Sequence, residues 1–487
     1  MLTADEFQLV SDKGLGIFYR MRFSVLLCFA LFANFILFAG HDQQRVIQIG
    51  TVTLGASILL VNPAVTTRLF AGYGGRALAT FLVIGIITAA AAFSPNFAMF
   101  EVANVFLLYL LANVIAFEIE RHGQHRLRLL LCCLGVVCTA YLYLFLIVYT
   151  SAISLGHRLA VDDFTPNFSN IRFFNHTQTS TLPLLLLLCC LTPRTSKLRW
   201  LWLAVTTYWW LALYATSARG TLMGMAAGCA VVALVARQRA MPYLRMIGLT
   251  AISAVAAYYV FLVAVPPMFG IEGMNAFSDT LNRTAADPTS ARTYLWHRAL
   301  SLIAQHPWLG VGPMHFAHHA GDLHLGAHPH DWLVQIAAEW GLPALLCLLI
   351  AIGLGLRALV RTGLRVPTGD TDNQTIFAAL LMGAVAILVD GLVSGIFVMP
   401  QSQLGVALYL GCALGWQRHL TAAAPQKVPQ RAARLLMTAS VVAAMVAVIA
   451  AVWSDVPARW RDDNLTPAQQ AANMGMLSPR LWTAGYF

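Results

Sequence analysis

A polar, histidine-rich stretch separates two long apolar runs of the chain and ends in HPHDWLVQIAAEWG, residues His328 to Gly341. Within it, His330 stands at the boundary between polar and apolar sequence, directly ahead of a segment that we predict to be a helix. Asp331 follows, and its carboxylate is expected to cap that helix. An imidazole with an unperturbed pKa near ~6.5 accepts a proton at neutral pH. His330 is therefore the candidate general base of a site at a water interface, with His328 as a supporting residue.

Three arginines could supply the anion-binding part of such a site. Arg219 lies in a short turn between two apolar segments, and Arg292 begins an amphipathic one. Arg172 is followed by His176 and Gln178, which we predict to be supporting residues. Charges so close to lipid normally face a bundle interior or a water-filled cavity, and the guanidinium fork suits phosphate oxygens. Arginines that converge with a histidine would suit a pyrophosphate leaving group beside a hydroxyl nucleophile; the alternative is that they only snorkel at the membrane surface.

The number of histidines also raises the question of a metal site. The polar stretch contains six of them: His315, His318, His319, His324, His328 and His330. Histidines a few residues apart, with Asp322 and Asp331 nearby, can bind zinc, but zinc sites need a defined geometry and an outer layer of supporting contacts. We predict no metal ligands and no cofactor, and we expect most of these histidines to face water.

Other reactive residues lie within the apolar runs. Glu101 and Asp390 are either proton-relay groups or neutral, hydrogen-bonded carboxylic acids. The nine cysteines also fall in apolar runs, without a CxxC motif, and are expected to be buried thiols rather than disulfide partners.

Composition indicates that these residues belong to a membrane protein. The chain is 59% hydrophobic and 11% charged, whereas soluble domains carry about 25% charged residues. Apolar runs of about 18–20 residues recur along it, each long enough to cross a hydrocarbon layer of ~30 Å as a helix. We expect an all-α polytopic membrane protein with about 12–13 transmembrane helices. The predicted spans are 23–40, 46–63, 77–93, 98–117, 129–155, 175–192, 200–217, 220–236, 246–264, 332–356, 376–396, 404–416 and 435–453.

The placement of Lys and Arg orients these spans. With the N-terminus in the cytoplasm, the cytoplasmic segments hold 21 of the 31 basic residues, as positively charged inner loops require. The net charge of +10 is thus a topology signal, and no nucleic-acid partner is expected. No cleavable signal peptide is expected either, because no small-residue cleavage site follows the first apolar run.

This topology predicts one polytopic domain, residues 1–453, with a long periplasmic loop at 265–331 and a short periplasmic tail at 454–487. Within the loop, the segment 290–310 has the periodicity of an amphipathic helix, which Pro307 and Gly310 would end.

Taken together, these residues resemble a known superfamily. The features are Arg219 after an aromatic helix, Arg292 ahead of TYLWHRALSLIAQHPWLGVG, and His330 followed by Gly341. They look like the bacterial O-antigen ligases, O-antigen polymerases and protein (pilin) O-oligosaccharyltransferases, most strongly over about residues 165–345. The family motif is His, usually Asn, Ser or Gln, nine residues, then Gly. Asp331 departs from it at the second position, and Leu346 stands where a small or polar residue is expected.

The resemblance implies an inverting, metal-independent glycosyltransferase at the periplasmic face of the bacterial inner membrane. Its donor would be a glycan linked to undecaprenyl pyrophosphate. His330 would activate the acceptor hydroxyl, while Arg219 and Arg292, with Arg172 as a third candidate, would bind the pyrophosphate.

The acceptor stays open at this point. It would be a lipid A–core sugar of lipopolysaccharide, a pilin serine or threonine, or a glycan repeat unit, as in an O-antigen polymerase. A different class is a transporter of an anionic lipid-linked substrate. Transporters tend to show repeated halves with paired broken helices, and this chain shows no internal repeat.

Overall fold

The computed structural model describes residues 40–61, 69–165, 167–276, 292–421, 431–462, 479–483 and 485–487, with single residues 278, 282 and 285 between them. This part of the chain forms helices and no strand. Six helical stretches within it are long and apolar enough to cross a membrane. The prediction of an all-α, multi-pass membrane protein is confirmed. The predicted first span, 23–40, lies outside the described residues apart from Gly40.

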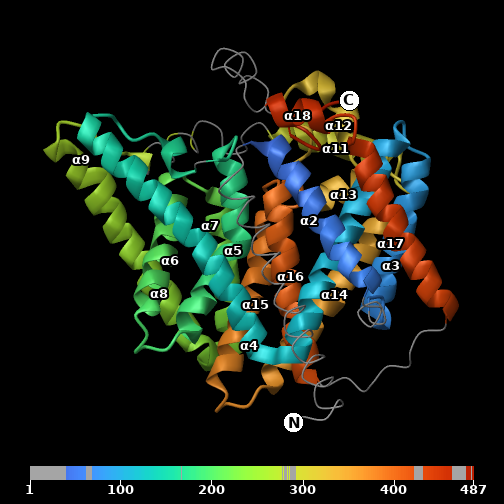
Figure 1. Ribbon diagram of the computed structural model, residues 1–487. Helices are drawn as coiled ribbons and strands as arrows, with labels where there is room; N and C mark the ends of the chain where they lie inside the picture. The colour runs from blue at the N-terminus through green and yellow to red at the C-terminus, as the bar shows by residue number, and fades with distance from the viewer. Residues whose placement is uncertain are drawn as a thin grey trace, which may run out of the picture.

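The long helices pack into one tilted bundle (Figure 1). They are α2 (His41–Val61), α3 (Gly72–Ala90), α4 (Pro95–Leu155), α5 (Ile171–Leu191), α6 (Leu198–Ala215), α7 (Arg219–Ala236), α8 (Met241–Tyr258), α14 (Leu342–Arg365), α15 (Thr371–Asp390), α16 (Pro400–Thr421) and α17 (Arg431–Val452). Helix α4 contains the predicted spans 98–117 and 129–155, with non-helical backbone at Gly123 between them. Helix α8 continues through a π-helical stretch, η4 (Tyr259–Ala264), into α9 (Val265–Met268).

A stripe of glycines brings α7 against α15. Gly220, Gly224 and Gly228 recur every four residues and therefore lie on one face of α7. A Cβ added at Gly224 would lie 2.6 Å from the carbonyl oxygen of Ala386, and one at Gly220 would lie 2.5 Å from Asp390 Oδ1. Small residues permit this close approach of backbones inside a membrane. The stripe therefore places the start of α7 directly beside the end of α15.

The long loop folds into short helices over one end of the bundle, which we call the loop end. They are α11 (Arg292–Gln305), α12 (Phe316–His319), η5 (Gly321–Leu323) and α13 (Trp332–Trp340). The predicted amphipathic helix at 290–310 is confirmed as α11, whose buried face packs against α12 and α13 in a small core of its own. That core contains Leu295, Ala299, Leu302, Phe316, Ala320 and Ala338.

The segment after His330 differs from the prediction. Residues 332–356 were expected to form one membrane span, but they belong to two helices, α13 and α14, separated at Gly341. Gly341 has φ 86°, and a Cβ there would lie 2.2 Å from the carbonyl oxygen of Trp308. Only glycine accommodates both the conformation and the contact. Helix α13 thus lies among the loop helices, and the membrane span begins at Leu342.

The C-terminal residues return to the loop end. Helix α18 (Val456–Asp462) follows α17, and residues 479–483 and 485–487 lie near α12 and α2 (Figure 1). The backbone N–H and the hydroxyl of Thr483 both donate to Asp42 Oδ1, at 2.6 and 2.8 Å. The predicted tail is therefore packed against the bundle over these residues.

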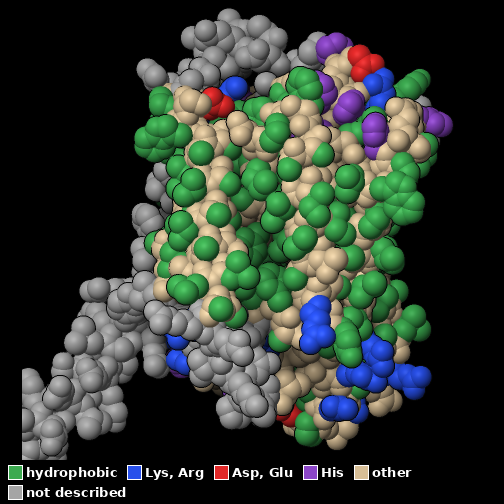
Figure 2. All heavy atoms as spheres, turned by 90° about the vertical axis from the view of Figure 1, so that its right-hand side faces the viewer, with side chains coloured by type: hydrophobic (Ala, Val, Ile, Leu, Met, Phe, Trp, Pro, Cys, Tyr) green, Lys and Arg blue, Asp and Glu red, His purple; other side chains and the backbone are tan. Residues whose placement is uncertain are grey.

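The surface is divided in the way a membrane protein requires. On the face in Figure 2, hydrophobic side chains form a broad band across the middle. Histidines and acidic residues gather at the top of this view, above α3 and α14, and Lys and Arg gather at the bottom. Charged groups thus mark the two ends of the bundle, and the middle presents an apolar surface to lipid.

Candidate active site

His330 occupies a strained position immediately before α13. Its φ is 57°, a left-handed conformation that is uncommon outside glycine and recurs at functional sites. Its backbone N–H donates to His328 Nδ1 at 3.3 Å, and the two imidazole rings lie 4.0 Å apart between centroids. The ring is half-buried rather than enclosed. Desolvation, and then the charge of Arg292, lower the pKa of His330 to about 3, so its resting state is neutral.

Asp331 and Trp332 fix the start of α13. Asp331 Oδ1 accepts from the backbone N–H groups of Leu333 at 2.9 Å and Val334 at 3.2 Å, which confirms the predicted helix cap. The Trp332 backbone N–H donates to the carbonyl oxygen of Gly391 at 3.1 Å, and its indole donates to that of Leu388 at 3.2 Å. The residue after the candidate base is thereby tied to the end of α15.

His328 is buried next to His330 and accepts a hydrogen bond from its backbone. Only 2% of its surface is exposed, and its ring fills the space beside Gly395, where a Cβ would lie 2.8 Å from His328 Cε1. Burial, together with His330, lowers the pKa of His328 well below its usual value. The neutral ring accepts through Nδ1 from the His330 backbone, which helps to hold the left-handed turn.

Arginines approach this histidine pair from two other elements. His176, on α5, interacts electrostatically with His330, Arg172 and Arg292. Arg172 is the second residue of α5, and its Nη1 donates to the carbonyl oxygen of Ser217 at 3.2 Å. Arg292 is the first residue of α11. Arg172, His176, Arg292 and His330, which come from separate parts of the sequence, therefore come close together at the loop end.

Arg219 belongs to the same region through its neighbours. The Arg219 backbone N–H donates to the Ser217 carbonyl oxygen at 2.9 Å, the same oxygen that Arg172 contacts. Arg219 is half-buried at the start of α7, and the adjacent Gly220 abuts the Asp390 carboxylate.

Asp390 is the buried carboxyl group of this region. Only 1% of its surface is exposed, and Oδ2 accepts from Thr179 Oγ1 at 2.7 Å. It also interacts electrostatically with Arg292. Asp390, which the sequence left as either a proton-relay group or a neutral carboxylic acid, thus lies close to Arg292.

Gln178 lies at the margin of the set. Its Nε2 donates to the Trp209 carbonyl oxygen at 2.8 Å, and its Oε1 accepts from Asn175 Nδ2 at 3.0 Å. The bond to Trp209 joins α5 to α6, which favours a role for Gln178 in helix packing.

The remaining histidines have separate environments. His315 is fully buried, with Nε2 accepting from the Ser94 backbone N–H at 2.8 Å, so the expectation that most of these histidines face water fails for His315 and His328. His318 stacks on Phe93, with ring centroids 4.2 Å apart, and His324 is exposed. Within the described ranges, no group of three or more His, Cys, Asp or Glu side chains converges as metal ligands would.

Comparison with known families agrees with this geometry. Residues 201–349 match the family described as O-antigen ligase. The matched segment contains Arg219, Arg292 and His330, and the predicted resemblance to the O-antigen ligase superfamily is confirmed over it. A comparison with curated proteins finds no match. The chain is thus a multi-pass membrane protein that resembles the O-antigen ligases in the segment carrying most of the site.

Sequence reasoning missed one buried cluster, which adjoins the loop end. Glu339 and Arg480 are almost completely buried and form an ion pair at 2.6 Å. Arg480 lies in the segment that the sequence predicted only as a short periplasmic tail. The available signals were two acidic residues within predicted membrane spans, Glu339 and Glu101, of which Glu101 lies 3.7 Å from Arg480.

Proposed function

We propose that this protein is a membrane O-oligosaccharyltransferase. It would move a glycan from undecaprenyl pyrophosphate to a hydroxyl group of an acceptor. The observation that carries the proposal is the meeting of Arg172, Arg292 and the His330–His328 pair at one end of an apolar bundle. The match of residues 201–349 to the O-antigen ligase family supports the same class of reaction.

The reaction is a direct displacement at the anomeric carbon. The acceptor oxygen forms the new glycosidic bond as its proton passes to the His330 imidazole, and the bond between the anomeric carbon and the pyrophosphate breaks. The leaving group departs as undecaprenyl pyrophosphate, and the configuration at the anomeric carbon inverts. Arg219, Arg292 and Arg172 stabilise the charge that develops on the pyrophosphate, usually the largest contribution to such catalysis.

The low pKa of the resting His330 is compatible with this role. Part of the lowering comes from the positive charge of Arg292. A bound pyrophosphate would neutralise that charge, so the basicity of His330 would rise when the donor is in place. The base would then be strengthened only in the complex that needs it.

The site is proposed to face the periplasm of a bacterial inner membrane, with the N-terminus in the cytoplasm. The acceptor is proposed to be a lipid A–core sugar or a pilin serine or threonine, with a glycan repeat unit as the third candidate. The reaction is proposed to require no metal and no cofactor, and membrane lipid is the only further partner expected.

Reconstitution tests the proposal. The purified protein is placed in liposomes with oligosaccharide on undecaprenyl pyrophosphate, and each acceptor is added separately after exhaustive chelation. We expect one acceptor to gain the glycan with an inverted linkage and undecaprenyl pyrophosphate to be released. Movement of the donor across the bilayer without transfer would instead identify a transporter, and loss of transfer on chelation, restored by one metal, would overturn the metal-free mechanism.

A further inference from the structure

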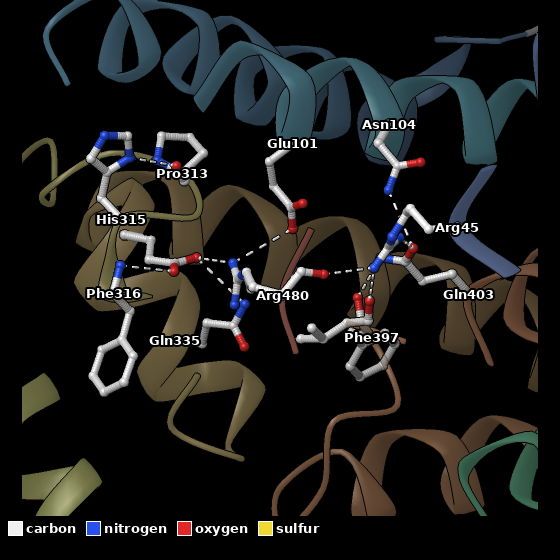
Figure 3. A network of polar contacts seen from close by, with 12 residues as sticks. Arg45, Glu101, Asn104, Pro313, His315, Phe316, Gln335, Phe397, Gln403 and Arg480 are labelled. Carbon is white, nitrogen blue, oxygen red and sulfur yellow. Dashed lines mark hydrogen bonds and ion pairs between the residues drawn. The ribbon is translucent and has the colours of Figure 1, made fainter. Parts of the chain in front are cut away.

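The strongest polar cluster outside the candidate site links the tail to α13. Arg480 is 2% exposed and Glu339 is 0% exposed. Arg480 Nη2 donates to Glu339 Oε2 at 2.6 Å and lies 3.7 Å from Glu101 Oε1 on α4. In the amide orientation that satisfies both partners, Gln335 Oε1 also accepts from Nη1 at 2.7 Å and Nη2 at 2.9 Å. Figure 3 shows the Arg480 guanidinium directed at Glu101 and Gln335.

A second arginine holds the backbone of the same segment. Arg45, on α2, is also 2% exposed. Its Nη2 donates to the Arg480 carbonyl oxygen at 2.9 Å, and its Nη1 donates to Gln403 Oε1 at 2.8 Å (Figure 3). Arg480 therefore contacts two helices. Its backbone carbonyl accepts a hydrogen bond from Arg45 on α2, and its side chain binds Glu339 on α13.

Glu339 connects this cluster to the candidate base. Gln335 and Glu339 are one turn apart on α13, which begins two residues after His330. Glu339 Oε1 also accepts from the Phe316 backbone N–H at 3.1 Å, which joins α13 to α12. The N-terminus of α13 is held by Asp331 and Trp332, and its other half is held by Arg480. A nine-residue helix is only about 14 Å long, so a change at Glu339 is transmitted to the His330 end.

We propose that Arg480 is a positioning residue for His330, which it orients through Glu339 and Gln335 on α13. The proposal rests on the function proposed above and adds a residue outside the segment matched to the family. Arg480 contacts neither donor nor acceptor in this scheme. It fixes the helix that presents the base, and misplacement of a reacting group by about 1 Å can lower a rate by as much as ~10²-fold.

Removal of Arg480 should affect turnover more than donor binding. We expect Arg480→Gln to lower kcat by at least about 10-fold and to change the apparent KM for the lipid-linked donor by less than about threefold, because the donor arginines are untouched. Arg480→Lys should retain more activity than Arg480→Gln, since it keeps the charge opposite Glu339. Arg158→Ala is the matched control, because Arg158 forms an exposed ion pair with Glu272 at 2.9 Å.

A double substitution tests whether Arg480 acts through Glu339. Arg480→Gln leaves a buried carboxylate without its cation, whereas Arg480→Gln with Glu339→Gln leaves two amides that can pair. We expect the double variant to lose no more kcat than Arg480→Gln alone. It also remains usable if Arg480→Gln fails to accumulate. A loss in the double variant equal to the product of the two single losses would overturn the proposal, as would an Arg480→Gln variant with wild-type kcat.

A measurement without turnover separates this proposal from the proposed function. Diethyl pyrocarbonate modifies accessible neutral imidazoles, and peptide mass spectrometry gives the rate at His330. We expect Arg480→Gln to change this rate several-fold and Arg158→Ala to leave it unchanged, whether or not any transfer is detected. An unchanged rate in Arg480→Gln would refute positioning. A changed rate in a protein that transfers no glycan would refute only the proposed function.

Discussion

At the residue scale, the site depends on imidazoles that are kept neutral. Desolvation and Arg292 hold the pKa of His330 at about 3, and burial lowers that of His328. A neutral His330 can take a proton, and a neutral His328 can accept the hydrogen bond that stabilises the left-handed turn. The same side-chain type therefore serves two purposes within three residues.

We predict that His330→Ala abolishes most transfer. General base catalysis typically contributes about 10²–10⁴-fold, so product formation should fall by that factor while the protein still accumulates in the membrane. The matched control is His324→Ala, because His324 also has a positive φ of 50° but is exposed. Reconstituted transfer rates, normalised to protein amount, provide the measurement. Wild-type activity in His330→Ala would remove it as the base and make His176 the next candidate.

Acidification should destabilise the fold through His328. Its pKa is lowered in the folded state, so the unfolded chain binds the proton more tightly and stability falls as the pH drops below about 6.5. Thermal unfolding in detergent between pH 8 and 4 measures this. His328→Asn, which keeps an acceptor for the His330 backbone, should show a shallower fall in Tm. If Tm falls with pH equally steeply in the wild type and in His328→Asn, His328 is not the group responsible.

At the element scale, the site is built from helix ends. Arg172, Arg219 and Arg292 lie in the first turns of α5, α7 and α11, and His330 precedes α13. The N-terminus of a helix carries partial positive charge, which favours an anion nearby. The caps and glycine contacts that set these ends in register therefore contribute directly to the site.

Two substitutions of Asp331 should distinguish the role of its helix cap from the role of its negative charge. Asp331→Ala removes both hydrogen bonds to the start of α13 and should cost about 1 kcal/mol of stability, with a loss of transfer because His330 is adjacent. Asp331→Asn keeps an acceptor and should preserve both. Tm and transfer rate are measured together. Loss of activity in Asp331→Asn at normal stability would assign a chemical role to the carboxylate.

The close packing of α7 on α15 should be necessary for both stability and transfer. Gly224→Ala would place a Cβ 2.6 Å from the Ala386 carbonyl oxygen, whereas Gly248→Ala on α8 would meet nothing within 4 Å. We expect the first substitution to lower Tm and transfer, since it moves the start of α7 away from the end of α15 at Asp390. The second should be neutral or slightly stabilising because alanine favours the helix. Equal effects of the two substitutions would exclude a role for this contact.

At the scale of the whole molecule, an apolar bundle carries its polar chemistry at one end. The described tail residues close over that end, where Arg480 and Thr483 bind partners from α13 and α2. The first and last described segments thus pack together beside the loop. Over the described residues, the loop end is thus a folded layer of short helices joined to the tail.

Topology is tested by labelling. Glu272 and Thr421 are both exposed, on segments that we assign to the periplasm and the cytoplasm. With the outer membrane permeabilised, an impermeant maleimide should label Glu272→Cys in intact cells, and Thr421→Cys only after the inner membrane is disrupted. The reverse pattern would invert the proposed orientation.

The sequence by itself determined the membrane-spanning class and most of the helix positions, and it predicted the residues of the candidate site. These follow from local properties: apolar runs of sufficient length, an acidic cap at Asp331, and arginines at segment ends where water begins. Periodicity alone also located α11. Such features need no knowledge of distant parts of the chain.

Only the tertiary structure decided which residues meet. The break at Gly341 depends on the approach of Trp308 from another segment, so the apolar run 332–356 could not reveal that α13 is separate. The hydrogen bond of Asp390 with Thr179 and the ion pair of Glu339 with Arg480 join residues 211 and 141 positions apart. Burial of a charge is favourable only beside its partner, and that partner is supplied by the packing of the bundle.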